Sequence, residues 1–228
     1  MGGGAWPASL FKVPVMMAYL FGAEAEPELL DRKVPFVASS SNSDSASSLL
    51  RDGRVYSFQE LIDIMITESD NAALNTLLAY LNEDILRELF GDLSIPYPEA
   101  ETGDPYTISP RLYSYFFRVL YNGTYLSPVM SERALALMSQ ATFVHGIALG
   151  LPDDVRVSHK FGERRLTNED GQTTGYELHD CGIVYYPEHA YFLCIFTQGE
   201  ELEPLTQTLG DLSALTYAEM QTLYPETE

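Results

Sequence analysis

A serine and a lysine three residues apart, Ser9 and Lys12, form the first of three short motifs with side chains suited to catalysis. Positions i and i+3 share a face at the start of a helix, so the Lys12 amine can approach the Ser9 hydroxyl. Pro7 suits a helix start and would leave Ser9 near the positive end of the helix dipole. Such a pair fits nucleophilic catalysis, in which an adjacent base removes the hydroxyl proton. A capping serine beside a solvated lysine gives the same pattern, so the pair alone does not decide.

The second motif, Ser69-Asp70-Asn71, falls at the junction of two expected helices. These three residue types are favoured helix caps, which offers a purely structural explanation. The functional interpretation is that the Ser69 hydroxyl points at Lys12 and relays a proton, while the Asn71 amide holds a substrate carbonyl and Asp70 orients the turn. Both interpretations stay open on this motif alone.

The third motif is His159-Lys160-Phe161-Gly162 in an otherwise apolar strand. A lysine there is costly to bury, so it either snorkels to water or awaits an anionic ligand. Glycine in a strand often marks a place where another backbone approaches closely. At Gly162 we expect that backbone to belong to a substrate.

The elements that must position these motifs change in type along the chain. The residue pattern predicts helices over 9–22, 57–67, 71–81, 110–121, 128–140 and 204–223, and strands over 155–162, 181–186 and 191–196. Ser57 and Glu60 form a capping box, and 164–177 is a polar excursion between strands. Helices followed by an antiparallel sheet and a terminal helix give an α+β fold. We expect one domain over 1–228, with a helical lobe at about 9–150 and the sheet with its terminal helix at about 151–224.

Composition excludes several classes of partner. The chain has 13 Lys plus Arg against 33 Asp plus Glu and a formal charge of −20, which disfavours nucleic acid and anionic membrane. No run of 18 apolar residues predicts a membrane-spanning helix. Residues 13–25 resemble a signal-peptide core and cleavage site, although no basic residue precedes Lys12.

The two cysteines, Cys181 and Cys194, fall in two apolar runs of an expected hairpin. A four-residue loop would place Tyr186 opposite Tyr191 and leave the cysteines diagonal, so we expect buried thiols without a bridge. The four histidines show no metal-ligand spacing such as H-E-x-x-H, and we expect no metal or other cofactor. The sequence therefore gives little support to a zinc hydrolase. His179 and Asp180, at the head of the hairpin, are weaker candidates for lining the site.

The three motifs in this order resemble the S-x-x-K, S-D-N and K-T-G set of class A β-lactamases and penicillin-binding proteins. The stretches that carry the resemblance are ASLFKVPV, ITESDNAALNTLL and GIALGLPDDVRVSHKFGE. The resemblance implies a β-lactamase/transpeptidase-like fold, in which a helical lobe accompanies an antiparallel sheet flanked by helices. It also makes 9–20 a buried nucleophile helix rather than a signal peptide.

The resemblance implies a role for each matching residue. Ser9 is then the acylated nucleophile, Lys12 its general base and Ser69 the shuttle of a proton to the leaving nitrogen. Asn71 binds the amide of the acyl side chain, and Lys160, followed by Phe161 and Gly162, attracts the substrate carboxylate. The backbone N–H groups of Ser9 and Glu163 form the oxyanion hole.

The substrate implied is a small molecule, either a β-lactam or a D-Ala-D-Ala-like peptide, and we expect the protein to act as a monomer. The family's targets imply a location outside the cytoplasm. Two alternatives remain: a D-Ala-D-Ala peptidase acting on peptidoglycan, and a non-catalytic cell-wall binding domain that kept the fold.

Three features depart from the family pattern. Phe161 replaces the Thr or Ser whose hydroxyl helps to bind the carboxylate, which predicts weak affinity for ordinary β-lactams. No Glu-x-x-Leu-Asn context for a deacylating glutamate occurs between Ser69 and Lys160, so we expect slow deacylation. Candidate substitutes in the acidic loop are Glu99, Glu101 and Asp104. Only eight residues precede Ser9 where the family has a helix and two strands, which predicts a truncated gene model or a fragment.

Overall fold

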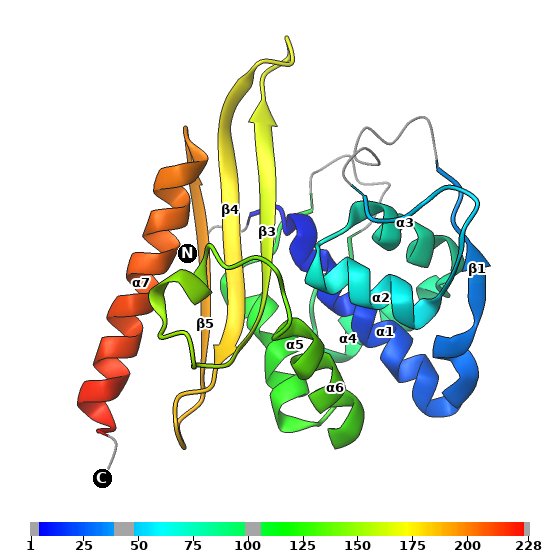
Figure 1. Cartoon of the computed structure of the whole chain (residues 1–228), viewed down its shortest axis with the longest axis horizontal. Helices are drawn as coiled ribbons and strands as arrows, with labels where there is room; N and C mark the ends of the chain where they lie inside the picture. Colours follow the sequence, from blue (N-terminus) through cyan, green and yellow to red (C-terminus); the bar gives the residue numbers. More distant parts are fainter. Residues whose placement is uncertain (1–4, 39–47, 99–105, 226–228) are drawn as a thin grey trace. The chain divides into compact units, whose positions relative to one another are not determined.

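The computed structural model describes residues 5–38, 48–98 and 106–225, and the chain divides into two compact units (Figure 1). The sheet unit comprises Met1–Leu10, Asp104–Phe117 and Ala141–Glu228, and the helical unit comprises Phe11–Gly103 and Arg118–Gln140. Residues 106–117 and 141–150, which we expected in the helical lobe, thus group with the sheet. That the chain forms one catalytic domain stays a prediction.

The helical unit is built around one buried helix. A 3₁₀ turn, η1 (Ala8–Phe11), leads into α1 (Lys12–Ala25), and every residue from Lys12 to Leu20 is buried. Helices that pack against α1 are α2 (Phe58–Thr67), α3 (Asn71–Tyr80), α4 (Glu83–Asp92) and α6 (Pro128–Met138). A helix that is apolar nearly all round must be covered on all sides, and this confirms the expected buried helix.

The remaining elements of the helical unit are short. The 3₁₀ turn η2 (Pro27–Asp31) precedes β1 (Lys33–Pro35), which pairs antiparallel with β2 (Val55–Ser57). The capping box that opens α2 is confirmed, because Glu60 N donates to Ser57 Oγ at 3.1 Å and Ser57 N donates to Glu60 Oε2 at 2.7 Å. That backbone donor lowers the pKa of Glu60. We did not predict α4, β1 or β2.

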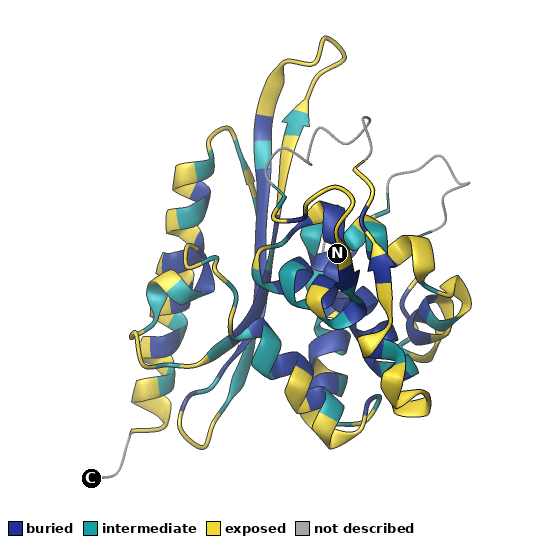
Figure 2. Cartoon of the chain, turned by 45° about the vertical axis from the view of Figure 1, so that its right-hand side comes forward, coloured by how far each residue is buried: buried dark blue, intermediate teal, exposed yellow. Residues whose placement is uncertain are grey.

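The sheet unit contains three antiparallel strands in the order β3 (Val157–Thr167), β4 (Thr173–Val184) and β5 (Tyr191–Gly199). The long helix α7 (Leu202–Leu223) packs against β4, β5 and the 3₁₀ turn η4 (Ile147–Gly150). The central strand β4 is buried over most of its length (Figure 2). The remaining helix, α5 (Pro110–Asn122), passes from the sheet unit into the helical unit. The α+β fold class is therefore confirmed.

The expected polar excursion at 164–177 is wrong, because β3 and β4 pair along most of it. Asn168 closes the turn by accepting Asp170 N at 3.1 Å and Gln172 N at 2.8 Å through Oδ1. Most side chains of this extension are exposed, so its residues are polar although its backbone is that of a hairpin. A polarity pattern cannot separate an exposed ribbon from a loop.

The two cysteines form a disulfide, so the expectation of free thiols is wrong. The β4–β5 connection spans six residues, 185–190, because Val184 rather than Tyr186 pairs with Tyr191. That register places Cys181 directly opposite Cys194. The error in loop length therefore became an error in cysteine pairing.

Candidate active site

Lys12, at the first position of α1, is fully buried among oxygen atoms of the turn between α2 and α3. Its Nζ donates to Asn71 Oδ1 at 2.6 Å, to the Ser69 carbonyl at 2.8 Å and to Ser69 Oγ at 3.3 Å. The structure thus brings Lys12, Ser69 and Asn71 together as expected. These partners are neutral, and a lysine amine removed from water is a group that enzymes use as a general base.

The turn that supplies these oxygens is held by Asp70. Its Oδ1 accepts Ala73 N at 2.8 Å as the N-cap of α3, and its Oδ2 accepts Leu49 N at 3.0 Å. Ser69 has a φ of 56°, in the left-handed region that non-glycine residues rarely adopt. This conformation is paid for by the surrounding structure, and such strain clusters at functional sites.

Ser9 lies in the η1 turn, which belongs to the sheet unit up to Leu10. Leu10 N donates to the Pro7 carbonyl at 2.9 Å, and Tyr113 Oη donates to the Leu10 carbonyl at 3.0 Å. Burial raises the pKa of Tyr113, so this phenol stays a donor. Ala8, the residue before Ser9, has a φ of 45°. The backbone around Ser9 is thus held on both sides.

Gly162 lies against this same turn. A Cβ added at Gly162 would come within 2.8 Å of the Pro7 carbonyl oxygen and 3.1 Å of Leu10 Cγ. The close approach predicted from a glycine in this strand is therefore made by the chain's own Ser9 turn. Any contact of Gly162 with a substrate backbone stays a prediction.

Lys160 is also fully buried, but its surroundings differ from those of Lys12. Its Nζ lies 4.0 Å from the centroid of the Phe161 ring and donates to the Phe161 carbonyl at 3.0 Å. The Phe161 ring in turn stacks on Phe143, with centroids 3.8 Å apart and planes inclined by 15°. Sequence reasoning missed Phe143, because nothing in its neighbourhood marks it as a partner of a residue 18 positions away.

A buried His–Asp pair lies beside Lys160. His159 Nδ1 is 2.9 Å and 3.0 Å from the two carboxylate oxygens of Asp180, and Asp180 Oδ2 accepts Ile147 N at 2.8 Å. His179 is buried against Phe196, with ring centroids 4.2 Å apart, and burial lowers its pKa to about 4. Within the described part of the chain, no group of three His, Cys, Asp or Glu side chains could hold a metal ion.

Of the other candidate site residues, one has an exposed side chain and three lie outside the described residues. Glu163 follows Gly162 on β3 with an exposed side chain. The three candidate deacylating residues, Glu99, Glu101 and Asp104, lie outside the described residues. None of the helices that the structure describes is long and apolar enough to cross a membrane.

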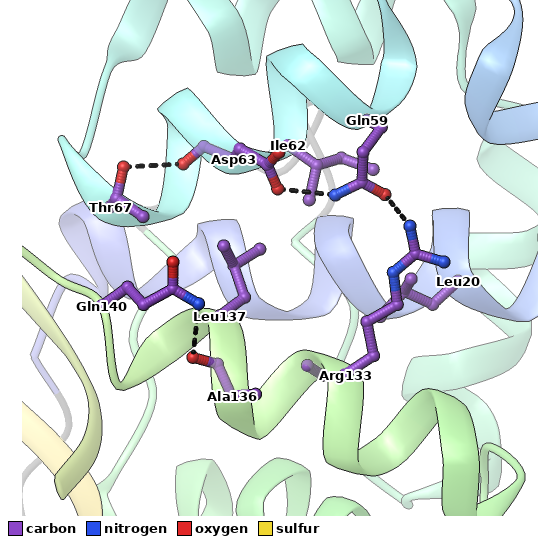
Figure 3. Close-up of a pocket in the computed structure, with 10 residues that line it drawn as sticks. Leu20, Gln59, Ile62, Asp63, Thr67, Arg133, Ala136, Leu137 and Gln140 are labelled. Atoms are coloured by element: carbon purple, nitrogen blue, oxygen red, sulfur yellow. Dashed lines mark hydrogen bonds between the residues drawn. The ribbon is translucent and has the colours of Figure 1, made fainter. Parts of the chain in front are cut away.

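A separate pocket of about 460 Å³ lies in the helical unit and contains none of the predicted site residues (Figure 3). A polar row on α2 and α6 lines one wall: Arg133 Nη2 donates to Gln59 Oε1 at 2.6 Å, and Gln59 Nε2 donates to Asp63 Oδ1 at 2.5 Å. Burial raises the pKa of Asp63. These side chains bond to one another and link α2 to α6, so a structural role explains their presence.

Comparisons with known proteins agree with one another. The model of a family described as the beta-lactamase enzyme family matches residues 6–220. A class A beta-lactamase from Bacteroides cellulosilyticus superposes with a TM-score of 0.80 and 20% identity, over 96% of this chain and 85% of that chain. The beta-lactamase from Francisella tularensis superposes with a TM-score of 0.77 and 18% identity, over 98% of this chain and 88% of that chain. The protein PBP-A superposes with a TM-score of 0.74 and 19% identity, over 95% of this chain and 81% of that chain. A search of curated proteins found no match.

Proposed function

The chain belongs to the beta-lactamase enzyme family, and on that premise we propose that it is a serine hydrolase that forms an acyl-enzyme on Ser9. The observation that carries the proposal is the buried Lys12 amine, which reaches both the Ser69 hydroxyl and the Asn71 amide oxygen. Any buried lysine needs acceptors, but proton transfer from a serine needs a desolvated base with a hydroxyl relay beside it, and Lys12 with Ser69 offers both.

The proposed reaction begins with attack of Ser9 Oγ on the carbonyl carbon of a cyclic amide, as the Ser9 proton passes to Lys12. The N–H groups of Ser9 and Glu163 stabilise the oxyanion. The carbonyl C–N bond then breaks, Ser69 donates its proton to the leaving nitrogen, and Lys12 returns a proton to Ser69. Water finally cleaves the Ser9 ester, slowly if no residue replaces the missing glutamate.

The proposed substrate is a β-lactam, and a neighbouring structure supports this choice by its fold. A mutant of PBP-A, 20% identical with a TM-score of 0.73, is described as an acyl-enzyme complex with penicillin G. The Cys181–Cys194 disulfide supports a location outside the cytoplasm, because disulfides persist in oxidising compartments. We further propose a monomer without a cofactor.

The second candidate function is a D-Ala-D-Ala peptidase, or a cell-wall binding domain without turnover. Phe161 favours it, because a phenyl ring replaces the hydroxyl that helps the family to bind a β-lactam carboxylate. The peptidase differs from the leading candidate in what happens after Ser9 is acylated, whereas the binding domain binds its ligand without acylation of Ser9.

A chromogenic cephalosporin with intact-mass analysis separates these outcomes. Sustained release of chromophore supports a lactamase, and a stable adduct that is absent from Ser9→Ala supports a penicillin-binding peptidase. Lys33→Met is the matched control, because Lys33 is the exposed third lysine of the chain. A protein that gives neither adduct nor turnover contradicts both enzymatic functions.

A further inference from the structure

The segment that leads into the Ser9 turn lies along strand β3, and both belong to the sheet unit. The guanidinium of Arg164 lies over the indole ring of Trp6, with Cζ 5.3 Å from the ring centroid. The next residue, Pro7, lies against Gly162, where an added Cβ would come within 2.8 Å of its carbonyl oxygen. Gly162 and Arg164 are two positions apart, so they share one face of the strand. That face therefore meets two successive residues of the segment before Ser9.

Arg164 is itself held by Glu177, its cross-strand partner on β4. Arg164 Nη1 lies 3.8 Å from Glu177 Oε2, and the Glu177 side chain is 11% exposed whereas that of Arg164 is 44% exposed. Glu177 Oε2 is buried and accepts no hydrogen bond within the described part of the chain. A buried carboxylate of this kind is costly unless a cation lies close to it. Arg164 thus compensates the Glu177 charge and also covers the Trp6 ring.

The turn that carries the serine needs support from outside, because Ala8 has a φ of 45°, which non-glycine residues rarely adopt on their own. Part of that support comes from backbone: Ala5 N donates to the Ile108 carbonyl at 3.1 Å, and Ile108 N donates to the Ala5 carbonyl at 2.9 Å. Those bonds form whichever side chains are present. The contact of Trp6 with Arg164 depends on the side chains at both ends, so it is a contact that substitution can remove.

We propose that Arg164 is a positioning residue for the acylation of Ser9, and that it acts through Trp6 on the turn that carries the serine. This inference rests on the proposed function and adds a residue to it. A guanidinium is attracted to the face of an indole ring, so Arg164 holds Trp6 on β3. Because Trp6 lies three positions before Ser9, a shift of the ring moves the backbone that enters the turn. A displacement of about 1 Å at a reacting atom can cost about 10²-fold in rate.

The first test is Arg164→Met, which keeps most of the side-chain stem and removes the guanidinium. With a chromogenic cephalosporin in stopped flow, we expect the rate constant for acylation of Ser9 to fall about tenfold, while the Kd of the first complex stays within about twofold of the wild type. Arg164→Lys retains a cation and should recover most of the rate. Arg165→Met is the matched control, because it removes the same charge from an exposed side chain on the opposite face of β3. Its rate should equal that of the wild type.

The double variant Arg164→Met, Glu177→Gln separates positioning from stability. Arg164→Met alone leaves the buried Glu177 carboxylate uncompensated and should unfold at lower urea, whereas the double variant buries no charge there and should regain stability. Its acylation of Ser9 should nevertheless stay slow. Recovery of the rate together with stability, an equal loss in Arg165→Met, or a weaker first complex in place of slower acylation overturns this inference and leaves the proposed function intact. Absence of a Ser9 adduct in the wild type overturns both.

Discussion

The two buried lysines of this chain lie in different surroundings, although both are wholly removed from solvent. Lys12, in the helical unit, donates to three oxygens of one polar turn, whereas Lys160, in the sheet unit, rests on a phenyl ring and one carbonyl. A proton relay requires hydroxyl and amide oxygens within hydrogen-bond distance, and the Lys12 amine has both at the Ser69 turn. Burial of a lysine therefore does not by itself define its role; the chemical type of the partners does.

The largest effect should follow loss of the Lys12 amine. Lys12→Met preserves most of the apolar volume but removes the proposed base, so we expect the rate of Ser9 acylation to fall about 10³-fold. Stopped-flow measurement with a chromogenic cephalosporin gives this rate. Thermal unfolding should show a stable fold, since an apolar replacement of a buried cation is often neutral or stabilising. A fall of less than tenfold would remove Lys12 from the base role.

The disulfide should give the next largest effect, on the sheet side alone. Cys181 and Cys194 are 13 positions apart, and closing a loop of that size stabilises by about 3 kcal/mol in the chain-entropy model. The double variant Cys181→Ala, Cys194→Ala should lose that amount in urea unfolding. Reduction of the wild type should reproduce the loss and leave the variant unaffected. Two free thiols in the unreduced protein would contradict the prediction.

His179 should make stability depend on pH. Its pKa is about 4 in the folded chain and about 6.5 when unfolded, so the unfolded chain binds the proton first as the pH falls. The stabilisation is complete above pH 6.5 and is lost between 6.5 and about 4, which amounts to about 2 kcal/mol between pH 7 and pH 5. His179→Phe retains a ring against Phe196, and its free energy of unfolding should fall less steeply between pH 7 and pH 5 than that of the wild type. Equal slopes in urea titrations of both proteins would be evidence against a buried neutral histidine.

A smaller effect is expected at Lys160, in contrast with Lys12. Lys160→Met should lower kcat/KM for penicillin G about tenfold, equal to about 1.4 kcal/mol, with the change in KM rather than kcat. The effect on its benzyl ester should be smaller, because that probe has no carboxylate. A loss as large as that of Lys12→Met, expressed in kcat, would erase the distinction between the two lysines.

Most of the helices, the antiparallel sheet and the meeting of Lys12 with the Ser69 turn were predictable, because periodicity and motif spacing are local signals. Other features, including the following three, were not. Helix α4 lacked a recognised start at Asn82, although its side chain caps the helix. The pairing of Cys181 with Cys194 depended on a loop length that differed by two residues. The stack of Phe143 on Phe161 depends on tertiary packing at Gly146, which leaves no trace in spacing.

The smallest effect concerns the contact of β3 with the Ser9 turn. Gly162→Ala places a Cβ within 2.8 Å of the Pro7 carbonyl, which is backbone and cannot rotate away, so the turn must shift. We expect a loss of about 1 kcal/mol, the low end for overpacking, together with slower acylation of Ser9. Gly91→Ala is the control, because nothing lies within 4 Å of its Cβ and alanine favours a helix by up to about 1 kcal/mol. If Gly162→Ala acylates at the wild-type rate, then contact between β3 and the turn does not position Ser9, and the sheet acts on the substrate alone.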